Sequence, residues 1–94
     1  MRNVTKLFQE LRKEHYKCAQ RLGDCLSCSI AKDPNIEVFT HDQSYTETGT
    51  WVYFHKIEGT VIKEVADRLN LKYEWEGNDN SAFFFKEASK GLPQ

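Results

Sequence analysis

The chain has 94 residues, a formal net charge of −1 at pH 7, and 39% hydrophobic residues. This length fits one domain, and the near balance of 13 basic and 14 acidic side chains gives no electrostatic reason to expect nucleic-acid binding. No apolar run is long enough to span a membrane, and the N-terminus does not have the pattern of a secretory signal. We therefore expect a cytoplasmic protein with reduced thiols, and its odd number of cysteines argues against a disulfide framework.

The first predicted element is a helix over residues 3–22. Its apolar face follows i, i+3, i+4, i+7 spacing and consists of Val4, Leu7, Phe8 and Leu11. The same stripe continues through His15 and Cys18, which places these two side chains one helical turn apart. Gly23 is well placed to end the helix.

The next segment is harder to assign. Within residues 24–33, either a short helix opens at Cys25 or residues 27–31 form a short strand. Proline and asparagine then predict a turn at residues 33–35. Residues 36–40 are rich in β-branched and aromatic side chains and predict a strand, and residues 41–49 form a polar loop.

The C-terminal half predicts a helix between strands. Residues 50–56 are apolar on both faces, which is typical of a central strand. Residues 60–70 have the pattern of an amphipathic helix. Residues 71–76 and 82–86 read as two strands of a hairpin, joined by the turn-forming residues 77–80.

The predicted fold is a single α+β domain over residues 1–94. Two helices pack on one face of an antiparallel sheet of about four strands, in the order α-β-β-α-β-β. Residues 88–94 are polar and should form a frayed tail.

One short segment contains all three cysteines and one of the three histidines. Its spacing is H-x2-C, six residues, then C-x2-C, which supplies four ligands of the kind that hold a tetrahedral zinc ion. The candidate ligands are Cys25, Cys28, Cys18 and His15, with His41 or His55 as an alternative ligand. The six-residue separation is shorter than in most zinc fingers, which counts against this ligand set.

The Cys25-x-x-Cys28 motif also permits two other interpretations. A cysteine that starts a helix has a lowered thiol pKa, so the pair can cycle as a disulfide. Asp24 opposes this because its charge disfavours a thiolate. Alternatively, the thiols only pack as small hydrophobic groups.

A cluster of polar residues around the predicted loop contains the residue types used in acid–base and nucleophilic catalysis. They are His41, Asp42, Ser44, Glu47 and His55. A polar loop of this size contains such residues by chance, and the sequence has no Gly-x-Ser-x-Gly, phosphate loop or His-Glu-x-x-His motif. We therefore expect no enzymatic activity and no cofactor, with zinc as the alternative.

The chain has twelve aromatic residues, more than one small core needs. Those left outside the core can anchor a protein partner, and the candidates are Trp75, Tyr73, Tyr45 and Trp51. On this interpretation, replacing an exposed Trp75 by alanine abolishes binding and leaves folding intact. The alternative is that these aromatics fill the core. Glu74 and Glu76 argue against base stacking by their aromatic neighbours.

Three pieces of the sequence together resemble a family of uncharacterised bacterial domains. The pieces are Asp24-Cys25-Leu-Ser-Cys28, Trp51-Val-Tyr-Phe-His55 and the stretch from Ala66 to Asn78. The family has a Cys-Cys-x-x-Cys segment, a Tyr/Phe-x-x-His strand and a Trp-x-Gly hairpin. This chain departs from it at Asp24, where the family's first cysteine lies. The resemblance implies no activity and carries over only Cys25, Cys28 and His55 as positions of interest.

The sequence thus favours a small intracellular non-enzymatic protein that acts by protein–protein binding. An accessory or inhibitor protein of bacterial or phage origin is the expected type. The alternative is a zinc-stabilised or cysteine-dependent redox domain that uses Cys25 and Cys28.

Overall fold

A twisted sheet runs through the part of the chain that this computed structural model describes, residues 2–87. The elements in chain order are α1 (Asn3–Lys13), β1 (Cys18–Ala19), α2 (Leu26–Lys32), β2 (Val38–Phe39), the 3-10 turn η1 (Asp42–Ser44), β3 (Gly49–Phe54), α3 (Gly59–Arg68), β4 (Tyr73–Glu74) and β5 (Phe83–Lys86). The predicted tail at residues 88–94 lies outside the described residues. No helix within residues 2–87 is both long and apolar enough to cross a membrane.

The strands are arranged in the order β1-β2-β3-β5-β4. β1 pairs with β2 in parallel, and the other neighbouring strands are antiparallel. The α+β class is confirmed. The prediction of about four antiparallel strands in the order α-β-β-α-β-β is wrong in detail, because the described residues form five strands in a mixed sheet and follow the order α-β-α-β-β-α-β-β. Strand β3 lies between β2 and β5, which confirms its predicted central position.

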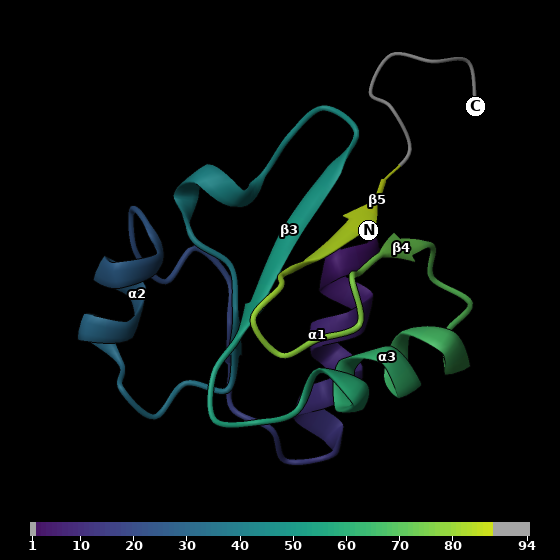
Figure 1. Cartoon of the computed structure of the whole chain (residues 1–94), viewed down its shortest axis with the longest axis horizontal. Coiled ribbons are helices and arrows are strands. Elements are labelled where there is room, and N and C mark those ends of the chain that lie inside the picture. Colours follow the sequence, from purple (N-terminus) through teal and green to yellow (C-terminus); the bar gives the residue numbers. More distant parts are fainter. Residues whose placement is uncertain (1, 88–94) are drawn as a thin grey trace.

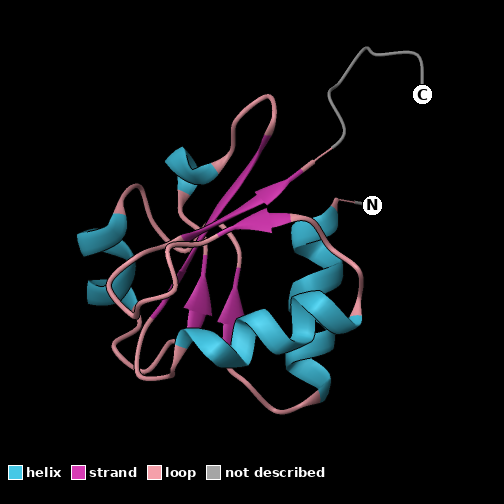
Figure 2. Cartoon of the chain, turned by 45° about the vertical axis from the view of Figure 1, so that its right-hand side comes forward, coloured by secondary structure: helices cyan, strands magenta, loops and turns pink. Residues whose placement is uncertain are grey.

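The helices lie on different sides of the sheet. Helices α1 and α3 pack against one face, and α2 lies apart from them beyond the sheet (Figures 1 and 2). The core between the sheet and α1 and α3 is buried and apolar; it comprises Val4, Leu7, Phe8, Leu11, Val38, Val52, Ile62, Val65, Ala66, Phe83 and Phe85. Helices α1 and α3 therefore form one layer on the sheet, and α2 is a third helix, beyond the two predicted, within residues 24–33.

The first helix ends nine residues earlier than predicted. The chain leaves α1 at His15, which adopts the left-handed conformation with φ 71°. The amides of His15 and Tyr16 donate hydrogen bonds to the carbonyls of Arg12 and Leu11, a pairing that terminates helices. The prediction of a helix over residues 3–22 is therefore wrong beyond Lys13. Consequently, His15 and Cys18 do not lie one helical turn apart.

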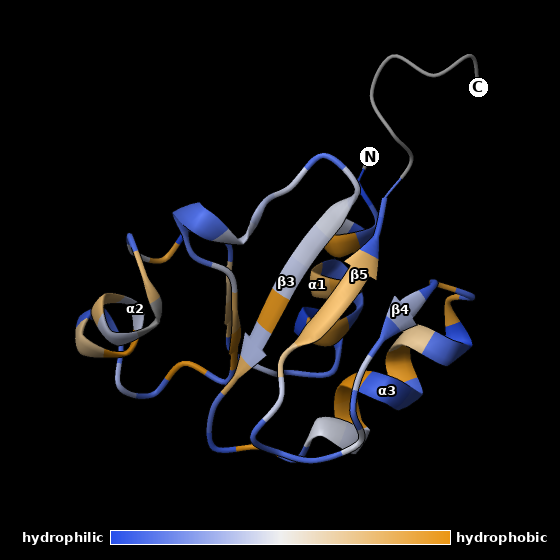
Figure 3. Cartoon of the chain, turned by 45° about the horizontal axis from the view of Figure 1, so that its top comes forward, coloured by the Kyte–Doolittle hydropathy of each residue, from blue (hydrophilic) through white to orange (hydrophobic). Residues whose placement is uncertain are grey.

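The C-terminal half follows its sequence pattern closely. Helix α3 ends at Arg68, Asn70 then adopts a left-handed conformation with φ 59°, and the amide of Leu71 donates to the carbonyl of Ala66. Strands β4 and β5 form the predicted hairpin, although both are shorter than expected. Figure 3 shows that β5 is hydrophobic along most of its length.

Acidic side chains from the C-terminal part of the chain cap helices α1 and α3. The Glu87 carboxylate accepts hydrogen bonds from the amides of Asn3 and Val4, at 2.7 and 3.0 Å, at the start of α1. The Asp79 carboxylate accepts one from the amide of Gly59, at 2.9 Å, at the start of α3. Neither helix has a side-chain cap from its own N-cap residue, so these distant carboxylates satisfy amides that would otherwise lack partners.

Candidate functional site

The four predicted zinc ligands do not come together. His15 is exposed at the end of α1, and Cys18 is half-buried in β1 beside Val38 of β2. Cys25 and Cys28 lie at the start of α2, with their sulfur atoms 3.4 Å apart. Within residues 2–87, no three or more His, Cys, Asp or Glu side chains are grouped so that they could hold a metal ion. The geometry therefore assembles a dithiol but not the predicted tetrahedral ligand set.

The two alternative histidine ligands belong to other parts of the sheet. His41 is buried and stacks on Tyr53, with ring centroids 4.9 Å apart. Its Nδ1 accepts a hydrogen bond from the amide of Gln43, so the ring caps η1. Burial lowers the pKa of His41. His55 is half-buried just after β3, and its amide donates to the carbonyl of Glu37.

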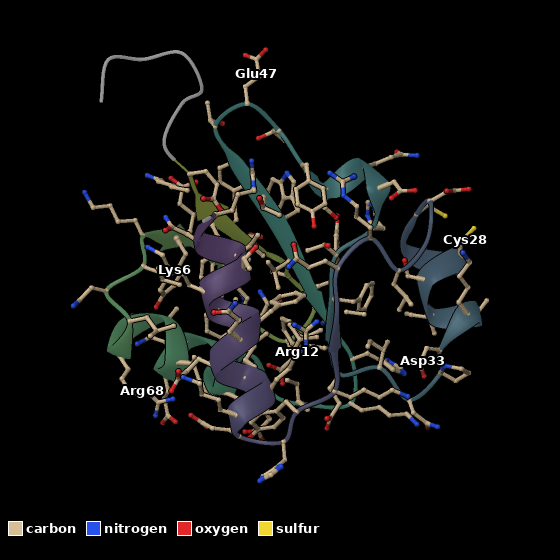
Figure 4. All side chains as sticks on the ribbon, turned by 180° about the vertical axis from the view of Figure 1, so that it is seen from behind. Lys6, Arg12, Cys28, Asp33, Glu47 and Arg68 are labelled. Carbon is tan, nitrogen blue, oxygen red and sulfur yellow. The ribbon has the colours of Figure 1, made fainter. Side chains whose placement is uncertain are left out.

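The polar loop does not place a nucleophile against a base. The Ser44 hydroxyl is buried and accepts a hydrogen bond from the backbone amide of His41, at 2.9 Å. The hydroxyl of Ser44 and the imidazole of His41 thus both make hydrogen bonds that close the η1 turn. Glu47 lies at the tip of the loop and points away from the molecule (Figure 4). These contacts explain the polar cluster as the local structure of a turn.

Three of the four predicted binding aromatics are engaged within the domain. Trp75 stacks on Phe83 with ring centroids 4.6 Å apart, and its Nε1 donates to the carbonyls of Asn78 and Ser81. Its six-membered ring lies over Gly59, where a Cβ atom would come within 2.4 Å of it. Trp75 is therefore half-buried and not exposed as expected, because the indole is part of the hairpin's packing, and its role in binding stays a prediction.

Tyr73 and Tyr45 are also held by neighbouring groups. Tyr73 packs against Phe83 and Phe85, and its hydroxyl donates to Asp67 at 2.9 Å. The hydroxyl of Tyr45 hydrogen-bonds to Thr40 and donates to Gln20. The guanidinium groups of Arg2 and Arg21 lie over the Tyr45 ring. Both tyrosines therefore stabilise the fold and offer little free surface.

Trp51 is the exception. It is 40% exposed and is the one large hydrophobic side chain that is exposed within residues 2–87. It lies opposite Phe84 in the β3–β5 register, on the face of the sheet turned away from α1 and α3, with ring centroids 4.8 Å apart. The two rings form part of a groove of about 520 Å³. Its other lining residues are Glu74, Trp75, Glu76, Asn80, Ser81 and Ala82.

The rim of this groove is acidic. Glu74 forms an ion pair with Lys86 at 3.4 Å, and both side chains are well exposed. Glu76 accepts a hydrogen bond from the Ser81 hydroxyl at 3.2 Å. Within the described residues, no lysine or arginine lines the groove itself. The site is thus an open aromatic groove with carboxylates at its edge.

Phe84 lines this groove and is not among the binding residues predicted from the sequence. It lies between two buried phenylalanines, Phe83 and Phe85, so the strand alternation alone turns it to the opposite face. The sequence therefore contained the information that Phe84 lies on the face opposite to Phe83 and Phe85. Its pairing with Trp51 depends on strand register, which the sequence does not specify.

Comparisons of this chain with protein-family models, curated proteins and solved structures found no match. The resemblance to the bacterial family with a Cys-Cys-x-x-Cys segment therefore stays a prediction. The residues themselves carry the functional proposal.

Proposed function

We propose that this chain is a non-enzymatic binding domain that holds a segment of a partner protein on the open face of β3, β5 and β4. The observation that carries the proposal is the exposure of Trp51 beside Phe84 at the groove. Tryptophan is enriched among the residues that dominate protein–protein binding energies, because it buries a large area with little loss of conformational freedom.

The charges at the groove favour a particular kind of partner segment. Glu76 places negative charge beside the aromatic rings, and Glu74 adds to it, although the ion pair with Lys86 partly offsets the charge of Glu74. A lysine or arginine of the partner can pair with these carboxylates and lie over the face of Trp51, while an adjacent apolar residue covers Phe84. The same carboxylates repel phosphate groups, so nucleic acid is the weaker candidate. The proposed ligand is a short peptide segment with basic and apolar residues side by side.

Selection of short peptides from a random displayed library on the purified domain tests this proposal. We expect the selected peptides to combine a basic residue with an aromatic or aliphatic one, and to bind in calorimetry. Trp51→Ala should weaken their binding about 30-fold, the effect of losing an anchor worth about 2 kcal/mol.

A matched pair of charge reversals separates the groove from the rest of the surface. Glu76→Lys alters the rim, whereas Glu64→Lys makes the same change on the exposed side of α3. We expect the first to weaken peptide binding several-fold and the second to leave it unchanged. Peptides that bind Trp51→Ala as tightly as the native chain would show that the groove is not the site.

A further inference from the structure

The thiols of Cys25 and Cys28 are arranged as a reactive pair. Their sulfur atoms are 3.4 Å apart, close enough for one thiol to hydrogen-bond to the other. Closure to a disulfide requires the sulfurs to approach by about 1.4 Å, since the bond length is about 2.0 Å. Cys25 is partly exposed, Cys28 is exposed, and Figure 4 shows Cys28 at the outer edge of the molecule. A small reagent can therefore reach the pair.

The backbone around the dithiol is held in place on both sides. Gly23 lies directly against α2, where a Cβ atom would come within 2.9 Å of the Ser29 amide nitrogen. The Ser29 amide and hydroxyl both donate to the carbonyl of Cys25, at 2.9 and 2.8 Å. The Gly23 carbonyl accepts from the amide of Asp42 at 2.8 Å. The segment before Cys25 is thus tied to the chain that follows β2.

The environment distinguishes the two thiols from each other and from the third. Hydrogen bonds from the backbone amide of Cys28 and, to a lesser extent, from its thiol favour the thiolate of Cys25 and lower the pKa of Cys25. The hydrogen bond to Cys25 raises the pKa of Cys28. Burial raises the pKa of Cys18 to about 11, so Cys18 stays protonated and unreactive at neutral pH.

We propose that Cys25 and Cys28 form a thiol–disulfide exchange site that takes small-molecule disulfides as its oxidant, with Cys25 as the attacking group and Cys28 as the resolving group. None of the residues that line the Trp51 groove belongs to α2. The exchange activity and the peptide binding can therefore be tested separately.

The exchange proceeds in two displacement steps. The Cys25 thiolate attacks one sulfur of the disulfide R–S–S–R, and the electron pair of the S–S bond leaves with one R–S⁻. Cys28 then loses its proton and attacks the Cys25 sulfur of the mixed disulfide, which expels the second R–S⁻. Two protons pass through water from the cysteines to the two leaving thiolates. The protein loses two electrons and two protons, and the small disulfide becomes two molecules of R–SH.

The test uses the full chain with oxidised glutathione as the probe. In Cys18→Ser, which keeps the pair, we expect a product that has lost two hydrogens, seen by intact-mass spectrometry after acid quenching. In Cys28→Ser the mixed disulfide of glutathione with Cys25 should accumulate, because the resolving thiol is missing. In Cys25→Ser, glutathione should add to Cys28 more slowly than it adds to Cys25 in Cys28→Ser, because the backbone amide of residue 28 favours the thiolate of Cys25. Circular dichroism of each variant checks that the substitution leaves the fold intact.

Three results would overturn the proposal. One is a Cys18→Ser protein that keeps both thiols in glutathione mixtures that fully oxidise dithiothreitol. Another is equal rates of glutathione addition to Cys25→Ser and Cys28→Ser, which would mean that the pair is only two exposed thiols. The third is a product consisting of disulfide-linked dimers, separated on a non-reducing gel.

Discussion

Glu87 joins the two ends of the described chain, and its replacement by alanine tests this connection. The carboxylate accepts the first two amides of α1, at 2.7 and 3.0 Å, and its side chain is only 6% exposed. Arg2 lies 3.9 Å from it and adds a weaker attraction. In Glu87→Ala, two amides near the interior lose a charged acceptor. Losing a capping side chain costs about 0.5–2 kcal/mol, and losing a negative charge at a helix N-terminus costs about 0.3–1 kcal/mol.

We therefore expect Glu87→Ala to lower the free energy of unfolding by about 2 kcal/mol, which corresponds to a fall in Tm of roughly 10 °C for a domain of this size. Glu87→Gln keeps one acceptor oxygen without the charge and should lose about half as much. The assay is urea denaturation followed by far-UV circular dichroism, with the slope of the transition unchanged.

Glu64→Ala is the control, because Glu64 is exposed on α3 and removing it should change stability by less than about 0.5 kcal/mol. If Glu87→Ala lies within the range of this control, the carboxylate does not cap α1 and the reasoning is wrong. If Glu87→Gln destabilises as much as Glu87→Ala, the negative charge alone supplies the effect.

Two further substitutions test the structural roles of Trp75, which packs on Phe83, and of His41, which caps η1. Trp75→Ala should destabilise the domain by about 3 kcal/mol in urea denaturation, since it removes the ring that packs on Phe83; a stable, folded variant would contradict this. Burial lowers the pKa of His41 below 6.5, so the unfolded chain binds a proton that the folded chain does not, and stability falls as the pH drops through this range. His41→Asn keeps a capping acceptor without titrating, and should lose less stability between about pH 7.5 and about pH 5.5 than the native chain. If the two proteins lose equal stability over this pH range, His41 does not contribute to the pH dependence of folding.

The sequence specified which faces are buried better than where the elements end. The four apolar residues of α1 are all buried as their spacing predicts, because helical periodicity depends only on local geometry. The end of α1 was missed because a histidine, His15, adopts the left-handed turn where glycine is usual. The parallel pairing of β1 with β2 was missed as well. It joins segments whose two-residue strands carry too little pattern to be recognised.

The candidate site was only partly predictable, because the environment of its aromatic side chains depends on contacts between residues far apart in the sequence. Alternation in β3 correctly turned Trp51 away from Val52. The expected exposure of Trp75 was wrong because its environment depends on Gly59, sixteen positions earlier, which leaves room for the indole. Long-range contacts of this kind decide whether an aromatic side chain packs or remains available, and a single sequence does not display them.

The last described strand has a consequence for how the protein is made. β5 lies between β3 and β4, and the carboxylates that cap α1 and α3 come from Glu87 and Asp79. A nascent chain that has not yet released residues 79–87 from the ribosome therefore has two uncapped helices and an open edge on β3. Edges of this kind pair readily with other chains. The domain should thus fold only after its C-terminal strand emerges, and a chain truncated before residue 79 should aggregate instead of forming a smaller domain.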